Sequence, residues 1–95
     1  MPQRTNGFVQ NNILDEDGKP AGGTATSLGI GINWQDGPIN AENEPNGALI
    51  EDVISICINR LEFLQNALGN SEYIEAIQHL TNALHALNKE AEEKS

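Results

Sequence analysis

The length of 95 residues fits one domain and leaves no room for a second hydrophobic core. Fourteen acidic and five basic residues give a net charge of −9, and residues 39–95 hold ten of the acidic and three of the basic residues. Such a charge repels nucleic acids and acidic membrane surfaces, so neither is expected as a partner. Any anionic ligand must be small and held by a local site.

The single cysteine, Cys57, lies in the apolar run 53–58 and is predicted to be a small buried hydrophobic residue. Residues 1–7 contain no apolar signal core, and no apolar run reaches the length of a membrane span. We therefore expect a cytoplasmic protein. His79 and His85 are six residues apart and cannot share a helix face, so no metal site is predicted, and no cofactor is expected.

The amino-terminal part is predicted to form a β region over residues 8–38, after a loose segment at 1–7. Residues 8–14 are a candidate strand that leads into a turn at 15–20. The Asp-x-Asp-Gly spacing in this turn weakly resembles a calcium loop, but the later acidic ligands are missing, so a plain turn is favoured.

Two adjacent glycines, Gly22 and Gly23, are predicted to be a flexible joint. The next segment has the period of two that is typical of a strand, with apolar residues on one face and glycines or asparagine on the other. Its apolar members are Leu28, Ile30, Ile32 and Trp34. The bare face is typical either of a tight bend in a sheet or of a floor for a bound molecule, and both interpretations stay open.

The carboxy-terminal half is predicted to be a helical hairpin. A polar loop at 39–46 precedes a first helix at 47–68, with Asn46 as its N-cap and Gly69 as its end. A second helix at 71–92 follows, with Ser71 as its cap. The short link makes the two helices antiparallel.

Apolar residues define the faces of both helices. The second helix carries one stripe, whose members are Tyr73, Ile77, Leu80, Leu84, Leu87 and Ala91. The first helix carries two: a main stripe of Ile50, Val53, Ile54, Cys57, Leu61, Leu64 and Leu68, and a second line of Leu49, Val53, Ile56, Phe63 and Ala67. Because one partner helix cannot cover two faces, we expect a homo-oligomer. The fold class is then α+β, a β-hairpin or small antiparallel sheet packed on an antiparallel helical hairpin.

Catalysis finds no support in the sequence, and the protein is not expected to be an enzyme. There is no defensible Ser/His/Asp set, no cysteine near a histidine and no phosphate loop. The adjacent acids Glu51 and Asp52 point to different sides of the helix, so a role at the helix start outweighs paired-carboxylate chemistry.

Arg60 lies on the second apolar line, beside Phe63, with no acidic residue three or four positions away. Three interpretations stay open: an ion pair with a carboxylate from elsewhere, a packed stem with the charged head in solvent, and a contact with a ligand phosphate.

Trp34 stands at the predicted strand end beside Gln35 and Asp36. Core packing is the ordinary role, but an aromatic ring flanked by an amide and a carboxylate can also stack and read a purine. Asn46 and Gly47 at a helix start would offer free backbone N–H groups to an anion. The candidate ligand-binding residues are therefore Trp34, Gln35, Asp36, Asn46, Gly47, Arg60 and Phe63.

Three segments resemble small phage proteins: GIGINWQDGP at 29–38, EPNGALIEDVI at 44–54 and RLEFLQ at 60–65. Residues 70–88 resemble the second helix of a hairpin shared by two groups of phage sponges, the Thoeris anti-defence and the anti-CBASS proteins. The resemblance covers about residues 28–88. The first two segments are the specific part of the resemblance.

The resemblance implies a homo-oligomer, with a hexamer favoured and a dimer as building block. It implies that the protein sequesters cyclic nucleotide immune signals in the cytoplasm of the infected bacterium without cleaving them. Cyclic ADP-ribose isomers are the ligands implied by the Thoeris type, and cyclic di- and trinucleotides can also be bound.

One departure from the resemblance concerns charge. Residues 39–43 carry no basic side chain, although the family is rich in arginine there, so phosphate binding must rest on Arg60, backbone N–H groups, Arg4 or Lys19. The rival interpretation is a helical-hairpin assembly or interaction module with no small-molecule ligand. An enzyme that turns over a cyclic nucleotide is a distant third.

Overall fold

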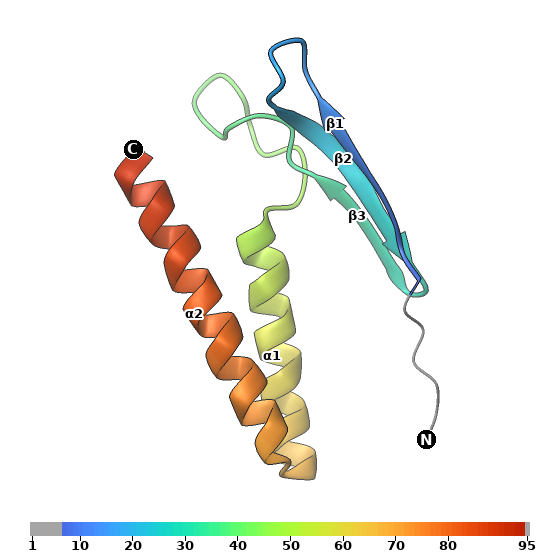
Figure 1. Cartoon of the computed structure of the whole chain (residues 1–95), viewed down its shortest axis with the longest axis vertical. Coiled ribbons are helices and arrows are strands. Elements are labelled where there is room, and N and C mark those ends of the chain that lie inside the picture. Colours follow the sequence, from blue (N-terminus) through green and yellow to red (C-terminus); the bar gives the residue numbers. More distant parts are fainter. Residues whose placement is uncertain (1–6, 95) are drawn as a thin grey trace. The chain divides into compact units, whose positions relative to one another are not determined.

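The computed structural model describes the backbone of residues 7–94 and the side chains of residues 7–90. It divides between Leu49 and Ile50 into two compact units, a sheet unit and a helical unit (Figure 1). The predicted α+β class is confirmed, because a three-stranded antiparallel sheet precedes two helices that contact each other. The single domain expected from the length, and the packing of the sheet on the helices, stay predictions.

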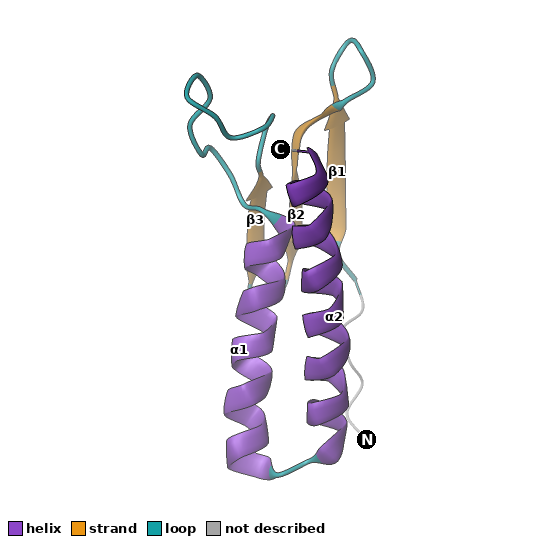
Figure 2. Cartoon of the chain, turned by 90° about the vertical axis from the view of Figure 1, so that its left-hand side faces the viewer, coloured by secondary structure: helices purple, strands orange, loops and turns teal. Residues whose placement is uncertain are grey.

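The sheet unit contains three strands in the order in which they occur along the chain (Figure 2). They are β1 (Val9–Leu14), β2 (Pro20–Ser27) and β3 (Ile30–Trp34), and each neighbouring pair is antiparallel. The turn between β1 and β2 is confirmed: the Asp15 side chain accepts hydrogen bonds from the backbone N–H groups of Asp17, at 2.8 Å, and Lys19, at 3.0 Å. The carboxylate of Asp15 therefore stabilises the turn from within.

The strand register places the apolar residues of β3 on one face. Gln10 of β1 is opposite Ala25 of β2, which is opposite Ile32 of β3. Because side chains alternate along a strand, Ile30 and Trp34 share this face with Ile32. The predicted alternation is thus confirmed, although β3 begins at Ile30 and Leu28 precedes it.

Gly22 and Gly23 do not form a joint, and that prediction is wrong. Both lie within β2, where Gly23 pairs with Asn12 on one side and with Trp34 on the other. A Cβ atom at Gly23 would collide with the backbone carbonyl of Asn11. Gly23 therefore allows β1 to approach β2 closely, and the strand continues through both glycines.

The helical unit consists of α1 (Ile50–Leu68) and α2 (Ser71–Lys94). The first helix begins three residues later than predicted, so Asn46 is not its N-cap. It ends as predicted at Gly69, which has a φ of +67° and donates its backbone N–H to the carbonyl of Gln65 at 2.8 Å. Such a residue in the left-handed region ends a helix at little steric cost.

The second helix begins at Ser71 as predicted, but its cap is Asn70. The Asn70 side-chain oxygen accepts a hydrogen bond from the backbone N–H of Glu72 at 2.9 Å. An amide oxygen that receives the N–H of the second helical residue is the usual N-cap arrangement. Ser71 itself is the first helical residue, so the prediction that it caps the helix is wrong.

The two helices contact each other through their half-buried faces. On α2 these residues follow the predicted stripe from Tyr73 to Leu87, whereas the side chain of Ala91 lies outside the described residues. On α1 the half-buried apolar residues are Val53, Ile54, Ile58, Leu61 and Leu64. Cys57 is exposed, and the prediction that it is buried is wrong, because Ile58 takes its place on the half-buried face.

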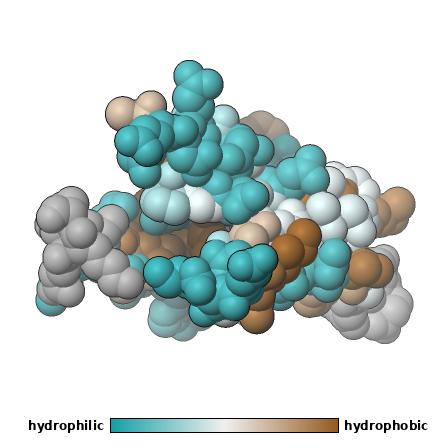
Figure 3. Space-filling view, turned by 90° about the horizontal axis from the view of Figure 1, so that it is seen from above, coloured by the Kyte–Doolittle hydropathy of each residue, from teal (hydrophilic) through white to brown (hydrophobic). Residues whose placement is uncertain are grey.

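Hydrophobic side chains stay accessible throughout the described part of the chain, where no residue is fully buried. Among residues 7–90, twelve large hydrophobic side chains are exposed, and of these Leu28 exposes 87% of its surface and Val9 70%. Hydrophobic residues accordingly reach the surface between hydrophilic ones on the face shown in Figure 3. Such a chain has unused capacity for apolar contact.

Neither helix of the described chain is long and apolar enough to cross a membrane.

Candidate functional site

The segment after β3 folds back and runs beside the end of that strand. Ala48 forms a parallel bridge with Trp34. The backbone N–H of Ala48 donates to the carbonyl of Asn33 at 2.7 Å, and the N–H of Gln35 donates to the carbonyl of Ala48 at 2.9 Å. The residues before α1 are therefore fixed to the carboxyl end of β3.

This approach requires a glycine at position 47. A Cβ atom there would lie 2.5 Å from the carbonyl oxygen of Trp34 and 2.7 Å from that of Asn33. Both obstacles are backbone atoms, which cannot move aside as a flexible side chain can. Gly47 is thus explained by close packing of two backbone segments, independently of any ligand.

Gln35 holds the same segment through its side chain. Its Oε1 accepts hydrogen bonds from the backbone N–H groups of Asn46, at 2.9 Å, and Gly47, at 3.1 Å. Two N–H donors require an oxygen, so they also fix the orientation of the amide. The two N–H groups are not free for an anion, and the prediction that they are is wrong. Gln35 Nε2 is buried and has no hydrogen-bond partner among the described residues.

Further amides complete what we call the amide cluster, which consists of Gln35, Asn40, Asn43 and Asn46. Asn43 Nδ2 donates to the carbonyls of Asp36, at 3.0 Å, and Pro38, at 2.8 Å. Asn46 Oδ1 accepts the backbone N–H of Asp36 at 2.8 Å, and its Nδ2 donates to the Asp36 carbonyl at 3.1 Å. Asn40 Oδ1 accepts the backbone N–H groups of Glu42 and Asn43. The loop from 36 to 46 is therefore held by side-chain amides.

Asp36 takes part in this cluster only through its backbone. Its N–H and carbonyl are bonded to Asn46 and Asn43, while its carboxylate has no hydrogen bond within the described chain and the residue is exposed. A carboxylate offers only acceptors, so it suits a ligand's amine or hydroxyl groups.

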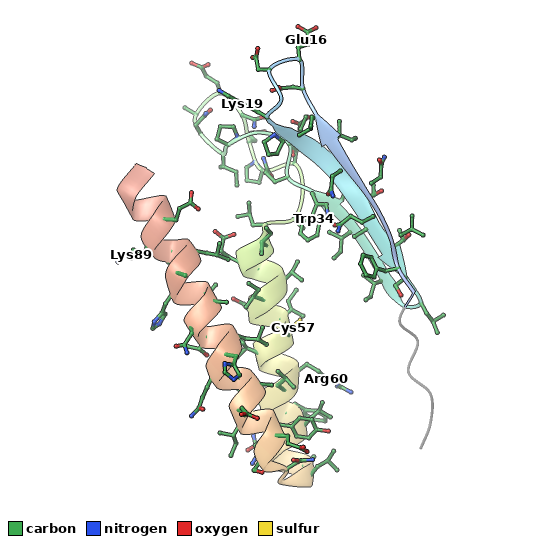
Figure 4. The ribbon with its side chains drawn as sticks, in the orientation of Figure 1. Glu16, Lys19, Trp34, Cys57, Arg60 and Lys89 are labelled. Carbon is green, nitrogen blue, oxygen red and sulfur yellow. The ribbon has the colours of Figure 1, made fainter. Side chains whose placement is uncertain are left out.

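Trp34 is half-buried on the apolar face of the sheet, at the end of β3 (Figure 4). Its indole Nε1 donates a hydrogen bond to Oε1 of Gln10 at 2.9 Å, which links β3 to β1 across β2. This bond satisfies the polar group of the ring and fixes the ring's orientation. A structural role is therefore plain, and a stacking role for the ring stays a prediction.

Arg60 and Phe63 form a separate pair on α1. The Arg60 guanidinium carbon lies 4.9 Å from the centre of the Phe63 ring, which is within the range of a cation–π contact. Both residues are exposed, and Arg60 projects from α1 on the side away from α2 (Figure 4). Within the described part of the chain, no ion pair involves Arg60.

The structure thus brings together five of the predicted residues, from Trp34 to Gly47, in the sheet unit. Arg60 and Phe63 belong to the helical unit, and their relation to the other five stays a prediction. The sequence reasoning missed Gln10 and Asn43. Asn43 gave a weak signal, because asparagine often bonds to nearby backbone in turns. Gln10 gave none, because its contact depends on the strand register. Arg4, a predicted phosphate contact, lies outside the described residues.

The chain is similar to a protein of a Bacillus phage. The chain is 41% identical over 64 residues to "Thoeris anti-defense 1" of Bacillus phage SBSphiJ7. The matched residues make up 66% of this chain and 44% of the relative, so the chain spans less than half of the relative's length. No family model matches the chain. At this level of identity, the chain is homologous to that phage protein.

Proposed function

We propose that this protein captures small cyclic nucleotide immune signals and withholds them, without cleavage, from a bacterial defence system. The observation that carries the proposal is the homology to a phage protein named for its action against Thoeris defence. In this account the protein is an anti-Thoeris protein of a phage, acts in the cytoplasm of the infected host and assembles as a homo-oligomer, with a hexamer favoured and a dimer as building block. Cyclic ADP-ribose isomers are the first ligands to test, and cyclic di- and trinucleotides are the next.

The ligand site that we propose lies at the carboxyl end of β3. The face of the Trp34 ring would stack on a base, an interaction that contributes about 1–3 kcal/mol per base in single-strand nucleic-acid binding. The Asp36 carboxylate would accept hydrogen bonds from an exocyclic amine or from ribose hydroxyls. Gln35 would support the site indirectly, because its Oε1 holds residues 46 and 47 in place while its Nε2 is buried away from a ligand.

Phosphate recognition needs a cation, and the chain has few. Lys19 is the one basic side chain in the described part of the sheet unit. In the helical unit, Arg60 is the basic side chain of α1. A guanidinium binds phosphate oxygens in pairs, so Arg60 with Phe63 beside it stays a candidate ligand contact.

Capture of the ligand without cleaving it has a clear consequence for function. A protein that only binds must be present in at least the amount of its ligand, and it competes with the host receptor through affinity alone. The binding energy then depends on stacking and hydrogen bonds that are already in place, which limits the entropy lost on binding.

The proposal is tested by Asp36→Asn. Because only the backbone of Asp36 holds the loop, this variant should fold as the original does. Loss of the carboxylate should weaken binding of a cyclic ADP-ribose isomer about tenfold in calorimetric titration, as expected for one hydrogen bond to a charged group. Glu16→Gln, in the turn after β1, is the matched control and should bind as the original protein does. Equal affinities for all three proteins would remove Asp36 from the site. An absence of binding by the original protein would favour the rival interpretation, an assembly module with no ligand.

A further inference from the structure

A second apolar face of α1 has no partner within the helical unit. An α-helix turns 100° per residue, so residues at intervals of three and four share a face. Ile56 and Phe63 lie on the face opposite to Ile54, Ile58 and Leu61, which are half-buried in the contact with α2. Ile56 exposes 68% of its surface and Phe63 57%. This face, with Ile56 at its centre, is called the outer face of α1.

Charge on the outer face is arranged symmetrically about Ile56. Asp52 lies four residues before it and Arg60 four residues after it. Both are exposed, and neither has an ion-pair partner in the part of the chain that the structure describes. An acid about one helical turn before an apolar centre and a base about one turn after it form a self-complementary pattern. When a second helix runs in the opposite direction, its base lies opposite the acid of the first helix and its acid opposite the base.

We propose that the outer face of α1 binds the outer face of a second copy of this chain, with the helices antiparallel and a two-fold axis at Ile56. In a two-fold contact each position meets the one equally far on the other side of the axis. Arg60 then meets Asp52 of the second copy, and the same ion pair forms again in the other direction. Ile56 meets its own counterpart at the axis.

The contact between Arg60 and Phe63 is compatible with this arrangement. A planar guanidinium can lie over an aromatic ring and still donate two parallel hydrogen bonds from its edge to a carboxylate. Phe63 would be covered by the amino-terminal end of the partner's α1, so that exposed apolar surface and unpaired charges are removed together. A different protein would have to match the same alternation of acid, apolar residue and base, whereas a second copy matches it without further requirement.

This inference rests on the oligomer included in the proposed function and names the contact of its dimer. Charge reversal tests it, with the mass of the ligand-free protein measured by analytical ultracentrifugation. Asp52→Arg or Arg60→Asp alone places like charges opposite each other twice, and should weaken dimer formation about tenfold or more. The double variant, Asp52→Arg with Arg60→Asp, restores opposite charges and should recover the original association.

A single variant that associates as the original protein does, or a double variant that fails to recover, overturns the proposal. Circular dichroism keeps unfolding distinct from dissociation, and both positions are exposed, so the helices should persist. If Arg60→Asp abolishes capture of a cyclic ADP-ribose isomer while the dimer is unchanged, Arg60 is a ligand contact and not an interface residue. Because the mass is measured without ligand, failure of the interface and failure of the proposed function give different results.

Cross-linking supplies a second test that needs no change of charge. Antiparallel helices packed about 9 Å apart bring Cα atoms at the axis to about 4–5 Å, within the range of a disulfide. Ile56→Cys in a Cys57→Ser background should therefore give a disulfide-linked dimer on oxidation. Glu62→Cys in the same background is the control, because it lies off the axis and should give little. Equal cross-linking of the two variants contradicts the proposed axis.

Discussion

The sheet unit and the helical unit are each stabilised from within, and the kind of contact differs between them. The loop after β3 is fixed by the amide cluster, in which side-chain oxygens and N–H groups bond to backbone two to twelve residues away. The helices are held by half-buried apolar stripes along α1 and α2. Hydrogen bonds have a direction and apolar contacts do not. The sheet unit should therefore be sensitive to the chemical nature of single residues, and the helical unit to the amount of apolar surface.

The largest expected effect concerns close packing in the sheet unit. Gly47→Val places side-chain atoms against the backbone carbonyls of Asn33 and Trp34, so the unfolding free energy should fall by about 3 kcal/mol. Gly31→Ala is the matched control, because a Cβ atom at Gly31 meets nothing within 4 Å. Urea denaturation at one protein concentration measures both. Equal losses for the two variants would contradict the described packing of residues 47–49 against β3.

In the helical unit, stability should depend on which apolar residue is shortened. Leu61→Ala removes a half-buried side chain from the contact with α2 and should cost about 2 kcal/mol. Leu68 belongs to the same predicted stripe but exposes 65% of its surface, so Leu68→Ala should cost about 0.5 kcal/mol. The difference in thermal midpoint between the two variants checks this. A reversed order would mean that α1 presents a different face to α2.

A smaller effect separates two functions of the Gln35 amide. Gln35→Met removes the oxygen that accepts the N–H groups of Asn46 and Gly47, and should cost about 1.5 kcal/mol. Gln35→Glu replaces the unpartnered Nε2 by a second oxygen and adds a negative charge, but it keeps an acceptor at the same reach, which the two backbone N–H groups bind as charge-assisted hydrogen bonds. The second variant should therefore retain more stability than the first in urea denaturation. If Gln35→Glu were the less stable of the two, the acceptor role would be wrong.

The smallest expected change in unfolding free energy concerns the residue that caps α2. Asn70→Ala removes the acceptor for the N–H of Glu72 and should lower the unfolding free energy by about 1 kcal/mol. Ser71→Ala, at the first helical position, should change it by less than about 0.5 kcal/mol. Thermal unfolding followed by circular dichroism at 222 nm compares them. A larger loss for Ser71→Ala would restore the cap predicted from the sequence.

Features that depend on residues close together in the sequence could be predicted from the sequence. The end of α1 at Gly69, the antiparallel helices and the alternation along β3 follow from neighbouring residues and were predicted correctly. Cys57 was misplaced because four of its five companions in the run 53–58 are apolar, so the spacing could not determine which of them face α2.

Contacts between distant residues were beyond the sequence. Asn46 looks like an N-cap because it is followed by a helical pattern, but its oxygen bonds to Asp36, ten residues earlier. Gly22 and Gly23 look like a joint because glycine is permissive, but both lie within β2, and Gly23 lets β1 approach closely. The candidate site was predicted by residue type at Trp34 and Asp36, while the partners that fix it, Gln10 and Asn43, depend on strand register and loop path.

Capture and release of a signal molecule decides whether this protein sequesters its ligand intact. The purified protein is incubated with a panel of cyclic ADP-ribose isomers and cyclic di- and trinucleotides, separated from free ligand and heated, and the released molecules are identified by mass spectrometry. We expect one signal to be recovered intact, at a stoichiometry set by the number of protomers. Recovery of nothing across the panel would contradict it and favour an assembly module, and recovery of a cleaved product would identify an enzyme.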